Sequence, residues 1–266
     1  MKKMKFSTLL GASLIVMASL ALSGCASTQA GKASGKTQAA QAENQDPFEG
    51  YNRIMFSMND AVDTVLMEPI ARGYRAAVPH PVRTGVSNFL DNLRGPVKVG
   101  NLFLQGDLGG AAEGTARFAI NSTVGVAGVF DVAKEADLKN RDEDFGQTLG
   151  VWGFDHGAYV VLPIIGPSSV RDGIGLAVDS YADPLRIYLR NIDENGWEYG
   201  RMAAVAIDDR ESLLDTLEDL QKHSLDYYAA VRSAYYQHRE AAVKNQESGR
   251  LMMAPAIPDY SAGEQD

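Results

Sequence analysis

The chain has 266 residues, a formal net charge of −9, a hydrophobic fraction of 45% and one cysteine. That length suits a single domain of ordinary size. The acidic balance argues against nucleic acid and anionic headgroups as electrostatic partners, so no nucleic-acid binding is expected. One cysteine excludes an intrachain disulfide, and the fold must therefore be held together by its own core.

The first 25 residues indicate export and lipidation. Three lysines lie within the first five residues, an uncharged apolar stretch covers residues 6–22, and the sequence LSGC ends at Cys25. This order is typical of a secretory signal peptide and not of a transmembrane helix. Because LSGC resembles the bacterial lipobox, residues 1–24 are predicted to be a lipoprotein signal peptide and Cys25 to carry the lipid. The alternative is an ordinary signal peptide with a chance cysteine.

Lipid on Cys25 would anchor the mature chain, since several acyl chains hold a protein stably at a membrane where one chain is marginal. Ala26 follows the cysteine, which resembles a signal for sorting to the outer membrane. Loss of residues 1–24 removes three lysines and no acidic residue, so the net charge changes from −9 to −12.

Two polar segments flank the predicted folded part. Residues 26–45 contain only Ala, Gly, Ser, Thr, Gln, Lys, Glu and Asn, which cannot build a core. Residues 25–45 are therefore predicted to be a lipidated flexible tether. Residues 245–266 are polar and then contain proline, and they are predicted to be a flexible tail. The helical domain is expected to cover residues 46–244.

Helical patterns dominate the first half of this domain. Asp46 as N-cap, Pro47 at N1 and Glu49 at N3 predict a helix start. Apolar residues at helical spacing continue that helix to Val65, and Pro69 is predicted to kink or end it.

The next helices follow the same reasoning. A helix over residues 82–93 is predicted to break at Gly95-Pro96 and to resume over residues 97–104. Asp107 is predicted to cap a further helix through Phe118.

The second half mixes helices with one apolar hairpin-like segment. Residues 159–165 form an apolar, β-rich run that contains Pro163. Helical spacing is far commoner than alternation, so the fold is predicted to be mainly α. The longest uncharged runs of the mature chain, residues 156–170 and 118–130, are shorter than the ~20 residues that a spanning helix needs. Helices are predicted over residues 142–152, 169–181, 199–222 and 224–244.

Catalytic signatures are not found. The sequence has no G-x-S-x-G elbow, no P-loop and no H-E-x-x-H, and its four histidines lack metal-ligand spacing. Ser168 and Ser169 follow Gly-Pro, which favours a turn and a helix cap over a nucleophile. We therefore expect no enzyme activity, no cofactor and no metal.

Several longer phrases follow one another along the chain, including DPFEGYNR at 46–53, NFLDNL at 88–93, NLFLQG at 101–106, DFGQTLGVWG at 144–153 and YVVLP at 159–163. Together, in this order, they resemble the VacJ/MlaA family of outer-membrane lipoproteins. The resemblance covers about residues 46–240, and the lipobox is its expected companion.

This resemblance implies a function and an architecture. Family members maintain outer-membrane lipid asymmetry by passing phospholipid from the outer leaflet to a soluble periplasmic carrier, MlaC. The resemblance implies a single ring-like helical domain with an amphipathic channel and a short irregular hairpin. This domain is expected to lie in the periplasmic-facing inner leaflet and to associate with trimeric porins. The alternatives are a structural or adaptor lipoprotein that binds porin without moving lipid, and a lipid hydrolase.

Polar residues within the apolar helices are the candidates for a channel lining that passes a phosphate headgroup. The alternative is that they satisfy helix ends and interhelix hydrogen bonds. These candidates are Asn52, Arg53, Asn88, Asn92, Asn101 and Gln105.

A glycine-rich stretch, residues 150–157, is the candidate gating loop, because glycine leaves the backbone free to swing. Its candidate residues are Gly150, Gly153, Asp155 and Gly157, and relatives often carry glycine where this chain has Asp155. In the family this stretch corresponds to a hairpin loop beside the channel. The alternative is a plain turn.

Overall fold

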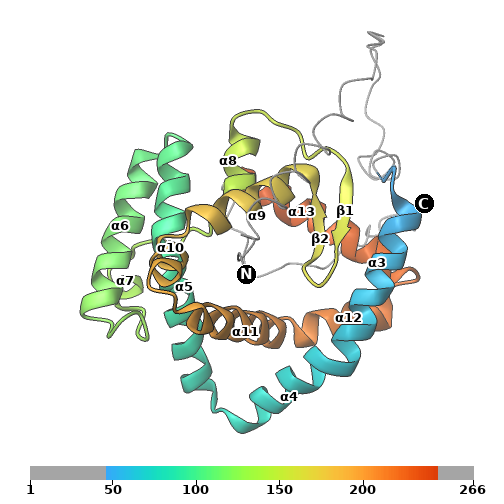
Figure 1. Ribbon diagram of the computed structural model, residues 1–266, viewed down its shortest axis with the longest axis horizontal. Coiled ribbons are helices and arrows are strands. Elements are labelled where there is room, and N and C mark those ends of the chain that lie inside the picture. The colour runs from blue at the N-terminus through green and yellow to red at the C-terminus, as the bar shows by residue number, and fades with distance from the viewer. Residues whose placement is uncertain (1–45, 245–266) are drawn as a thin grey trace, which may run out of the picture. The chain divides into compact units, whose positions relative to one another are not determined.

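The computed structural model describes residues 46–244 (Figure 1). The signal peptide, Cys25, the tether and the C-terminal tail lie outside the described residues. Helices make up most of the described part, which confirms the mainly α fold. In chain order the elements are α3 (Glu49–Val62), η1 (Asp63–Met67), α4 (Glu68–Ala77), α5 (His80–Leu104), α6 (Leu108–Thr123), α7 (Val132–Glu135), α8 (Phe145–Val151), β1 (Tyr159–Leu162), β2 (Gly166–Ser169), α9 (Val170–Ala182), α10 (Pro184–Asn191), α11 (Asn195–Ser212), α12 (Leu214–His223) and α13 (Tyr227–Val243).

Within residues 46–244 the elements contact one another in a closed circuit. α3 continues through η1 into α4, α4 contacts α11 and α12, and α11 contacts α10. The circuit closes as α10 contacts α9, α9 contacts β2, and the β1–β2 hairpin contacts α3 (Figure 1). α5 runs beside this circuit and contacts α6, α8, α10 and α11. The ring-like architecture is thereby confirmed for this part of the chain.

None of the helices in residues 46–244 has the length and apolar character needed to cross a bilayer.

Side-chain caps start several helices where the sequence predicted them. Asp107 accepts a hydrogen bond from the Gly110 amide, and Ser169 accepts one from the Asp172 amide. The prediction for Asp46 was wrong, because Phe48 occupies the N-cap of α3. The Asp46 carboxylate is instead drawn into the fold by Arg232, whose Nη1 lies 3.0 Å away.

Two prolines, Pro69 and Pro96, were predicted to interrupt helices. Pro69 lies in the first turn of α4, where a missing N–H costs little, and the π-helical turn η1 joins α4 to α3 without a break. The predicted break at Gly95-Pro96 was wrong, since α5 runs through Pro96 uninterrupted. Packing explains this result: a Cβ at Gly95 would lie 2.9 Å from the Phe118 ring, so α6 presses closely against α5 at this position.

The hairpin holds the small aromatic core. β1 and β2 pair antiparallel, with Tyr159 opposite Ser169. Tyr159 and Val161 are fully buried and cluster with Tyr228 of α13. The short hairpin segment predicted from the sequence is thus a regular two-stranded sheet that joins the two ends of the described chain.

Large apolar side chains remain exposed along helix faces. On α3 and η1, Ile54, Met58 and Val65 are 60%, 55% and 79% exposed, and their spacing places them on one face. Further exposed apolar residues lie on α9 and α10, including Ile174, Tyr181 and Tyr188. Soluble monomers rarely expose contiguous apolar faces of this kind, so these faces indicate contact with a membrane or another protein.

Candidate functional site

The first pair of predicted polar residues joins α3 to other elements. Asn52 is fully buried; its amide donates to the Tyr159 carbonyl at 3.0 Å and accepts from the Val161 amide at 2.9 Å. Arg53 is exposed and forms an ion pair with Asp226 at 2.7 Å. Asn52 therefore serves the hairpin, and Arg53 serves the start of α13.

The second pair anchors a turn. Asn88 donates to the Val129 carbonyl at 3.2 Å, and Asn92 donates to the Ser122 hydroxyl at 2.9 Å. Both residues are on α5. Asn88, and Asn92 through a further contact with the Ala127 carbonyl at 3.4 Å, hold the tight, glycine-rich segment that follows α6.

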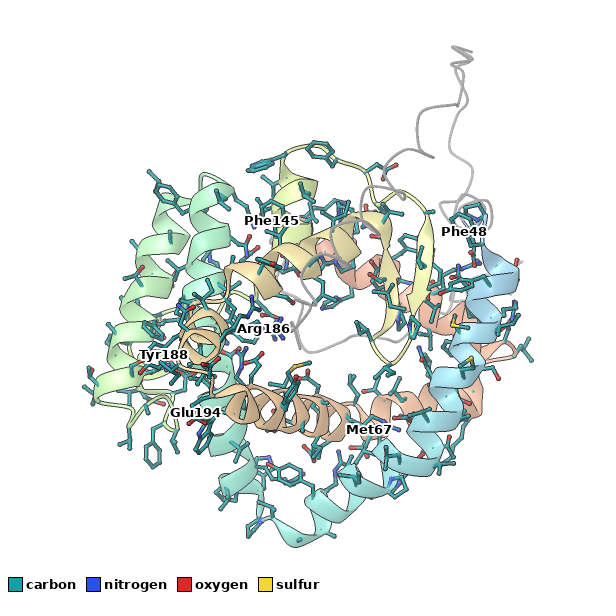
Figure 2. The ribbon with its side chains drawn as sticks, viewed as in Figure 1. Phe48, Met67, Phe145, Arg186, Tyr188 and Glu194 are labelled. Atoms are coloured by element: carbon teal, nitrogen blue, oxygen red, sulfur yellow. The ribbon has the colours of Figure 1, made fainter. Side chains whose placement is uncertain are left out.

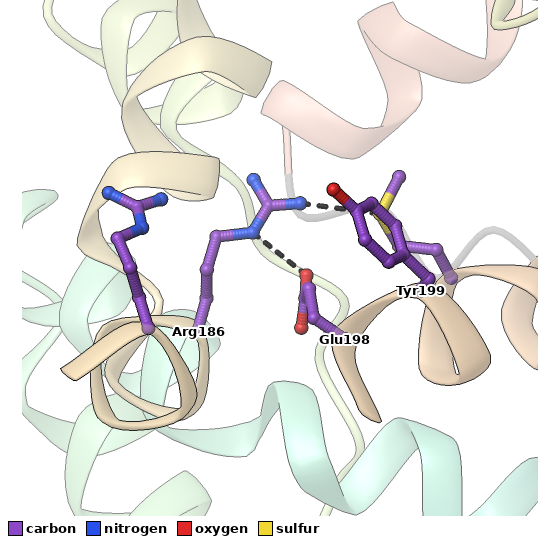
Figure 3. Close-up of a pocket in the computed structure, with 5 residues that line it drawn as sticks. Arg186, Glu198 and Tyr199 are labelled. Atoms are coloured by element: carbon purple, nitrogen blue, oxygen red, sulfur yellow. Dashed lines mark hydrogen bonds and ion pairs between the residues drawn. The ribbon is translucent and has the colours of Figure 1, made fainter. Parts of the chain in front are cut away.

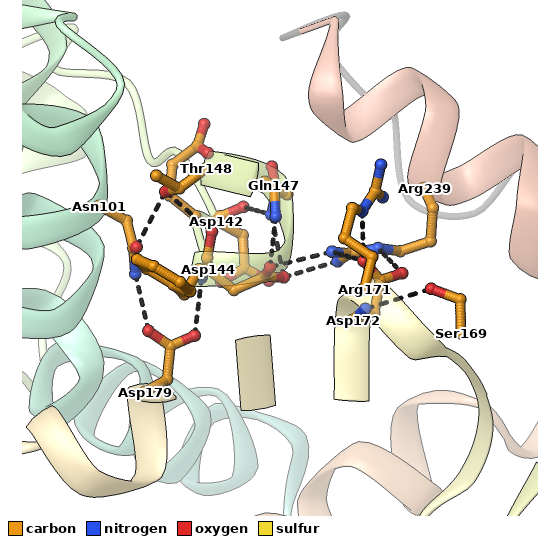
Figure 4. A network of polar contacts seen from close by, with 12 residues as sticks. Asn101, Asp142, Asp144, Gln147, Thr148, Ser169, Arg171, Asp172, Asp179 and Arg239 are labelled. Carbon is orange, nitrogen blue, oxygen red and sulfur yellow. Dashed lines mark hydrogen bonds and ion pairs between the residues drawn. The ribbon is translucent and has the colours of Figure 1, made fainter. Parts of the chain in front are cut away.

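The third pair meets at the junction of α5, α8 and α9. Asn101 is buried, donates to Asp179 at 2.9 Å and accepts from Thr148 at 2.9 Å (Figure 4). Gln105 is half-buried and donates to Glu143 at 2.8 Å. The six predicted residues thus lie in three separate pairs, and each pair is hydrogen-bonded to different elements.

The candidate gating loop has a packed end and an open end. Gly150 lies in α8, where a Cβ would be 2.7 Å from Val243, so glycine is needed there for packing. Gly153 has φ +92° and open space around it. The Asp155 carboxylate accepts a hydrogen bond from the His156 backbone amide at 2.7 Å, and Gly157 has φ +67°. Neighbouring side chains therefore leave room for motion at Gly153 and not at Gly150.

Sequence reasoning missed a buried ionic cluster between α8, α9 and α13. It contains Asp144, Arg171, Asp172 and Arg239 (Figure 4), and the Tyr235 hydroxyl donates to Asp172. Arg239 donates to Asp144 at 2.6 and 2.9 Å and to Asp172 at 3.0 Å. Burial alone would raise the pKa of Asp144, but the hydrogen bonds and charge of Arg239 hold it at about 2. The cluster has no spare charge, which points to a structural role.

A second group of charged side chains lies on α5 and α11, which contact each other. Arg94 of α5 and Asp209 of α11 have exposed side chains, and Asp142 is 70% exposed. Nevertheless, desolvation by the surrounding protein raises the pKa of Asp209, and the charge of Arg94 opposes that rise. Neither Arg94 nor Asp209 forms an ion pair within residues 46–244.

A pocket of about 220 Å³ lies between α10 and α11 (Figure 3). We call it the α10–α11 pocket; it is lined by Arg186, Arg190, Glu198, Tyr199 and Met202. Figure 2 places Arg186 on the side of α10 that faces the middle of the circuit and Tyr188 on the opposite side. The Arg186 side of the pocket therefore faces the middle of the circuit, whereas Tyr188 points away from it.

Ion pairs neutralise one cation of the pocket but not the other. Arg186 donates to Glu198 at 2.8 Å, and Arg201 also pairs with Glu198, at 3.0 Å. Arg190 lies over the Tyr181 ring at 5.6 Å and makes no ion pair within the described residues. The pocket thus combines one spare positive charge with two partly apolar side chains, Tyr199 and Met202.

Sequence reasoning missed this pocket too, although the sequence contains one signal for it. Arg186 and Arg190 are four residues apart, a spacing that puts two side chains on the same face of a helix. The helix itself, α10, was not predicted. The partners on α11 come from tertiary contact, for which the sequence has no local signal.

Among the described residues, no group of three or more His, Cys, Asp or Glu side chains is arranged to hold a metal ion.

Known proteins resemble this chain over most of its length. A family model described as "MlaA lipoprotein" matches residues 44–242. The intermembrane phospholipid transport system lipoprotein MlaA of Escherichia coli K12 is 36% identical, over 90% of this chain and 88% of that protein. Its counterpart in Haemophilus influenzae is 32% identical, over 96% and 97%.

Two further matches are of other kinds. An uncharacterized protein of Rickettsia felis is 34% identical, over 80% of this chain and 84% of that protein. A solved structure that concerns the structural basis for maintenance of bacterial outer membrane lipid asymmetry matches with a TM-score of 0.65 and 36% identity. The match covers 74% of this chain and 98% of that one.

Proposed function

Because this chain belongs to the MlaA lipoprotein family, we propose that it removes mislocalised phospholipid from the outer leaflet of the outer membrane. The lipid passes through an amphipathic channel to a soluble periplasmic carrier that is similar to MlaC. This activity maintains the lipid asymmetry of the outer membrane and involves no covalent chemistry on the lipid.

One observation carries the proposal: large apolar side chains are exposed on helix faces, while a charged side chain faces the middle of the circuit. Val65 is 79% exposed on η1, and Arg186 of α10 points to the middle of the circuit (Figure 2). Arg94 of α5 and Asp209 of α11 are further exposed charged side chains, and these two helices contact each other. Apolar faces stabilise a protein in acyl chains at ~25 cal/mol per Å² removed from water, whereas a phosphate headgroup needs polar partners. A phospholipid requires both environments along its route.

The same arrangement suggests how the protein is held. We propose that lipid on Cys25 anchors the chain in the periplasmic-facing inner leaflet of the outer membrane, with the domain lying in that leaflet. The exposed faces of α3, η1 and α9 then contact acyl chains or a trimeric porin. The site residues predicted from the sequence act in this proposal mainly by holding the circuit together.

The proposal is tested by removing the exposed charges of α5 and α11. The double variant Arg94→Leu/Asp209→Leu keeps the net charge but makes both positions apolar. We expect cells that carry it to accumulate outer-leaflet phospholipid, measured by labelling of surface-exposed lipid. The matched control is Arg72→Leu/Glu218→Leu, which removes an exposed ion pair of 2.9 Å between α4 and α12.

The control should preserve asymmetry. Wild-type asymmetry in the Arg94→Leu/Asp209→Leu cells would contradict a route past these charges and leave the adaptor function, in which the protein binds porin without moving lipid. Purified protein should release no fatty acid from phospholipid; release that depends on Ser168 or Ser169 would instead support a hydrolase.

A further inference from the structure

We propose that the α10–α11 pocket binds the phosphodiester group of a phospholipid, with Arg190 as the cation that contacts it. This inference rests on the proposed function, since it names a binding step on the proposed route. It also identifies residues of this chain that have no counterpart among the sites predicted from the sequence.

Arg190 carries a positive charge that no carboxylate of the described residues neutralises. Its side chain is exposed, contacts the Tyr181 ring at 5.6 Å and pairs with no carboxylate in residues 46–244. The ring holds the guanidinium by cation–π contact without satisfying its hydrogen-bond donors. An arginine held in this way is ready to bind an oxyanion, because its planar fork matches two oxygens of a phosphate.

The carboxylates near the pocket are already paired with other arginines. Glu198 is buried and accepts hydrogen bonds from Arg186 at 2.8 Å and from Arg201 at 3.0 Å. Asp183 is buried, caps α10 and pairs with Arg201 at 2.5 Å. These three arginines and two acids leave Arg186 and Arg201 balanced, and Arg190 supplies one net positive charge in an otherwise acidic protein.

One side of the pocket is partly apolar. Tyr199 and Met202 are 71% and 50% exposed, although both are large and partly apolar. The Met202 sulfur lies 3.5 Å from Arg186 Nη2, so apolar and charged surfaces adjoin (Figure 3). A ligand that covers both surfaces carries an anion on an apolar body, which describes a phospholipid better than free phosphate.

Pocket size limits which part of the lipid enters. A volume of about 220 Å³ lies below the ~300–1,000 Å³ of sites that enclose a drug-sized ligand. The pocket therefore accommodates the headgroup region, and the acyl chains extend past Tyr199 and Met202. Because Arg186 faces the middle of the circuit, the headgroup is held on the inner side (Figure 2).

The test measures binding by the full-length acylated protein in a nonionic detergent, using isothermal titration calorimetry. The probe is dihexanoylphosphatidylglycerol, with dihexanoylglycerol and inorganic phosphate as the two comparison ligands. We expect Arg190→Gln to weaken probe binding by about tenfold or more, the range for hydrogen bonds to a charged group. Arg190→Lys keeps the cation and should retain part of the affinity.

Matched variants separate the pocket from general charge. Arg72→Gln removes an exposed arginine of α4 and should leave the affinity unchanged, whereas Met202→Ser should weaken binding of the probe but not of phosphate. Circular dichroism verifies that each variant is folded. An unchanged affinity of Arg190→Gln overturns the proposal, as does equal affinity for dihexanoylglycerol. Inorganic phosphate binding as tightly as the probe would assign a free-phosphate site and overturn the lipid assignment.

Failure here and failure of the proposed function are distinguishable. If Arg190→Gln binds the probe normally, the pocket assignment fails, while the proposed function still depends on Arg94 and Asp209. If cells carrying Arg94→Leu/Asp209→Leu keep normal asymmetry, the proposed function fails even where the pocket binds the probe.

Discussion

Two arginine-rich regions of this molecule contrast sharply. In the buried ionic cluster, Arg239 lies between Asp144 and Asp172 and satisfies both. In the α10–α11 pocket, Arg190 is exposed and its guanidinium contacts an aromatic ring. One arginine thus binds carboxylates that hold the fold together, whereas the other has no carboxylate partner for its hydrogen-bond donors among the described residues. The presence of a carboxylate partner, and not the arginine itself, distinguishes a structural site from a binding site.

The two regions should respond differently to substitution: the buried ionic cluster should affect stability, and the α10–α11 pocket should affect binding. Removing one member of a buried ion pair leaves an unpaired buried charge and is strongly destabilising. Removing an exposed, unpaired arginine deprives no other charge of its partner and costs little stability. Substitutions in the two regions should therefore differ most in the free energy of unfolding.

The largest effect is expected for Arg239→Met. The substitution leaves the carboxylates of Asp144 and Asp172 without their shared cation and should lower the free energy of unfolding by about 3–5 kcal/mol. Denaturant unfolding of the detergent-solubilised protein, followed by circular dichroism, measures the change. Arg190→Gln is the matched control and should change it by less than about 0.5 kcal/mol. Similar losses in both variants would abolish the distinction between the two regions.

The buried ionic cluster also predicts a pH dependence. The folded-state pKa of Asp144 is depressed from 3.8 to about 2, so its contribution is present above pH ~4 and is lost as pH falls towards 2. The shift corresponds to about 2 kcal/mol. Asp144→Asn keeps an N-cap residue for α8 but removes the charge, so its stability should fall less steeply between pH 4 and 2. An equally steep fall in both proteins would assign the acid sensitivity to other groups.

A smaller effect is expected on the outer face, where the proposed membrane contact is apolar. Val65→Glu introduces a charge at a position that is 79% exposed on η1. Folding should be unaffected, but binding to vesicles should weaken by about tenfold, because a carboxylate enters acyl chains at high cost. Gln237→Glu adds the same charge at an exposed position of α13 and is the control. Equal vesicle binding by the two variants would argue against η1 as a membrane contact.

Local signals explain what the sequence predicted correctly. Helical spacing and capping residues act over a few positions, so the mainly α fold and the caps at Asp107 and Ser169 could be predicted. Pro96 could not, because α6 packing at Gly95 overrides the local helix-breaking tendency. Asp46 was misassigned for the same reason, since its carboxylate pairs with Arg232, far away along the chain.

The candidate site depends even more on tertiary contact. Asn52 is a polar residue within an apolar helix, which predicted a channel lining. In the structure its side-chain amide is hydrogen-bonded to the backbone of the hairpin. Arg239 and Asp144 are distant in sequence, as are Arg94 and Asp209, so neither group is visible as a motif. For the α10–α11 pocket, the four-residue spacing of Arg186 and Arg190 is the one signal that the sequence contains.

The smallest effect concerns the candidate gating loop. Gly153 has φ +92° with open space around it, so Gly153→Ala should cost only about 1 kcal/mol, from backbone strain alone. Proline cannot adopt a positive φ and would distort the loop, which makes alanine the cleaner substitution. Gly73 lies within α4, also with open space around it, and there the same change should stabilise the protein by about 0.5–1 kcal/mol.

If the loop gates lipid passage, Gly153→Ala should slow the removal of outer-leaflet phospholipid in cells, because alanine restricts the backbone at the one open position of the loop. Gly73→Ala should leave that rate unchanged. A stability loss at Gly153 with normal lipid removal would mean that this glycine serves only the turn. Slower removal by both variants would point to a general effect of backbone stiffness and would also argue against the gate.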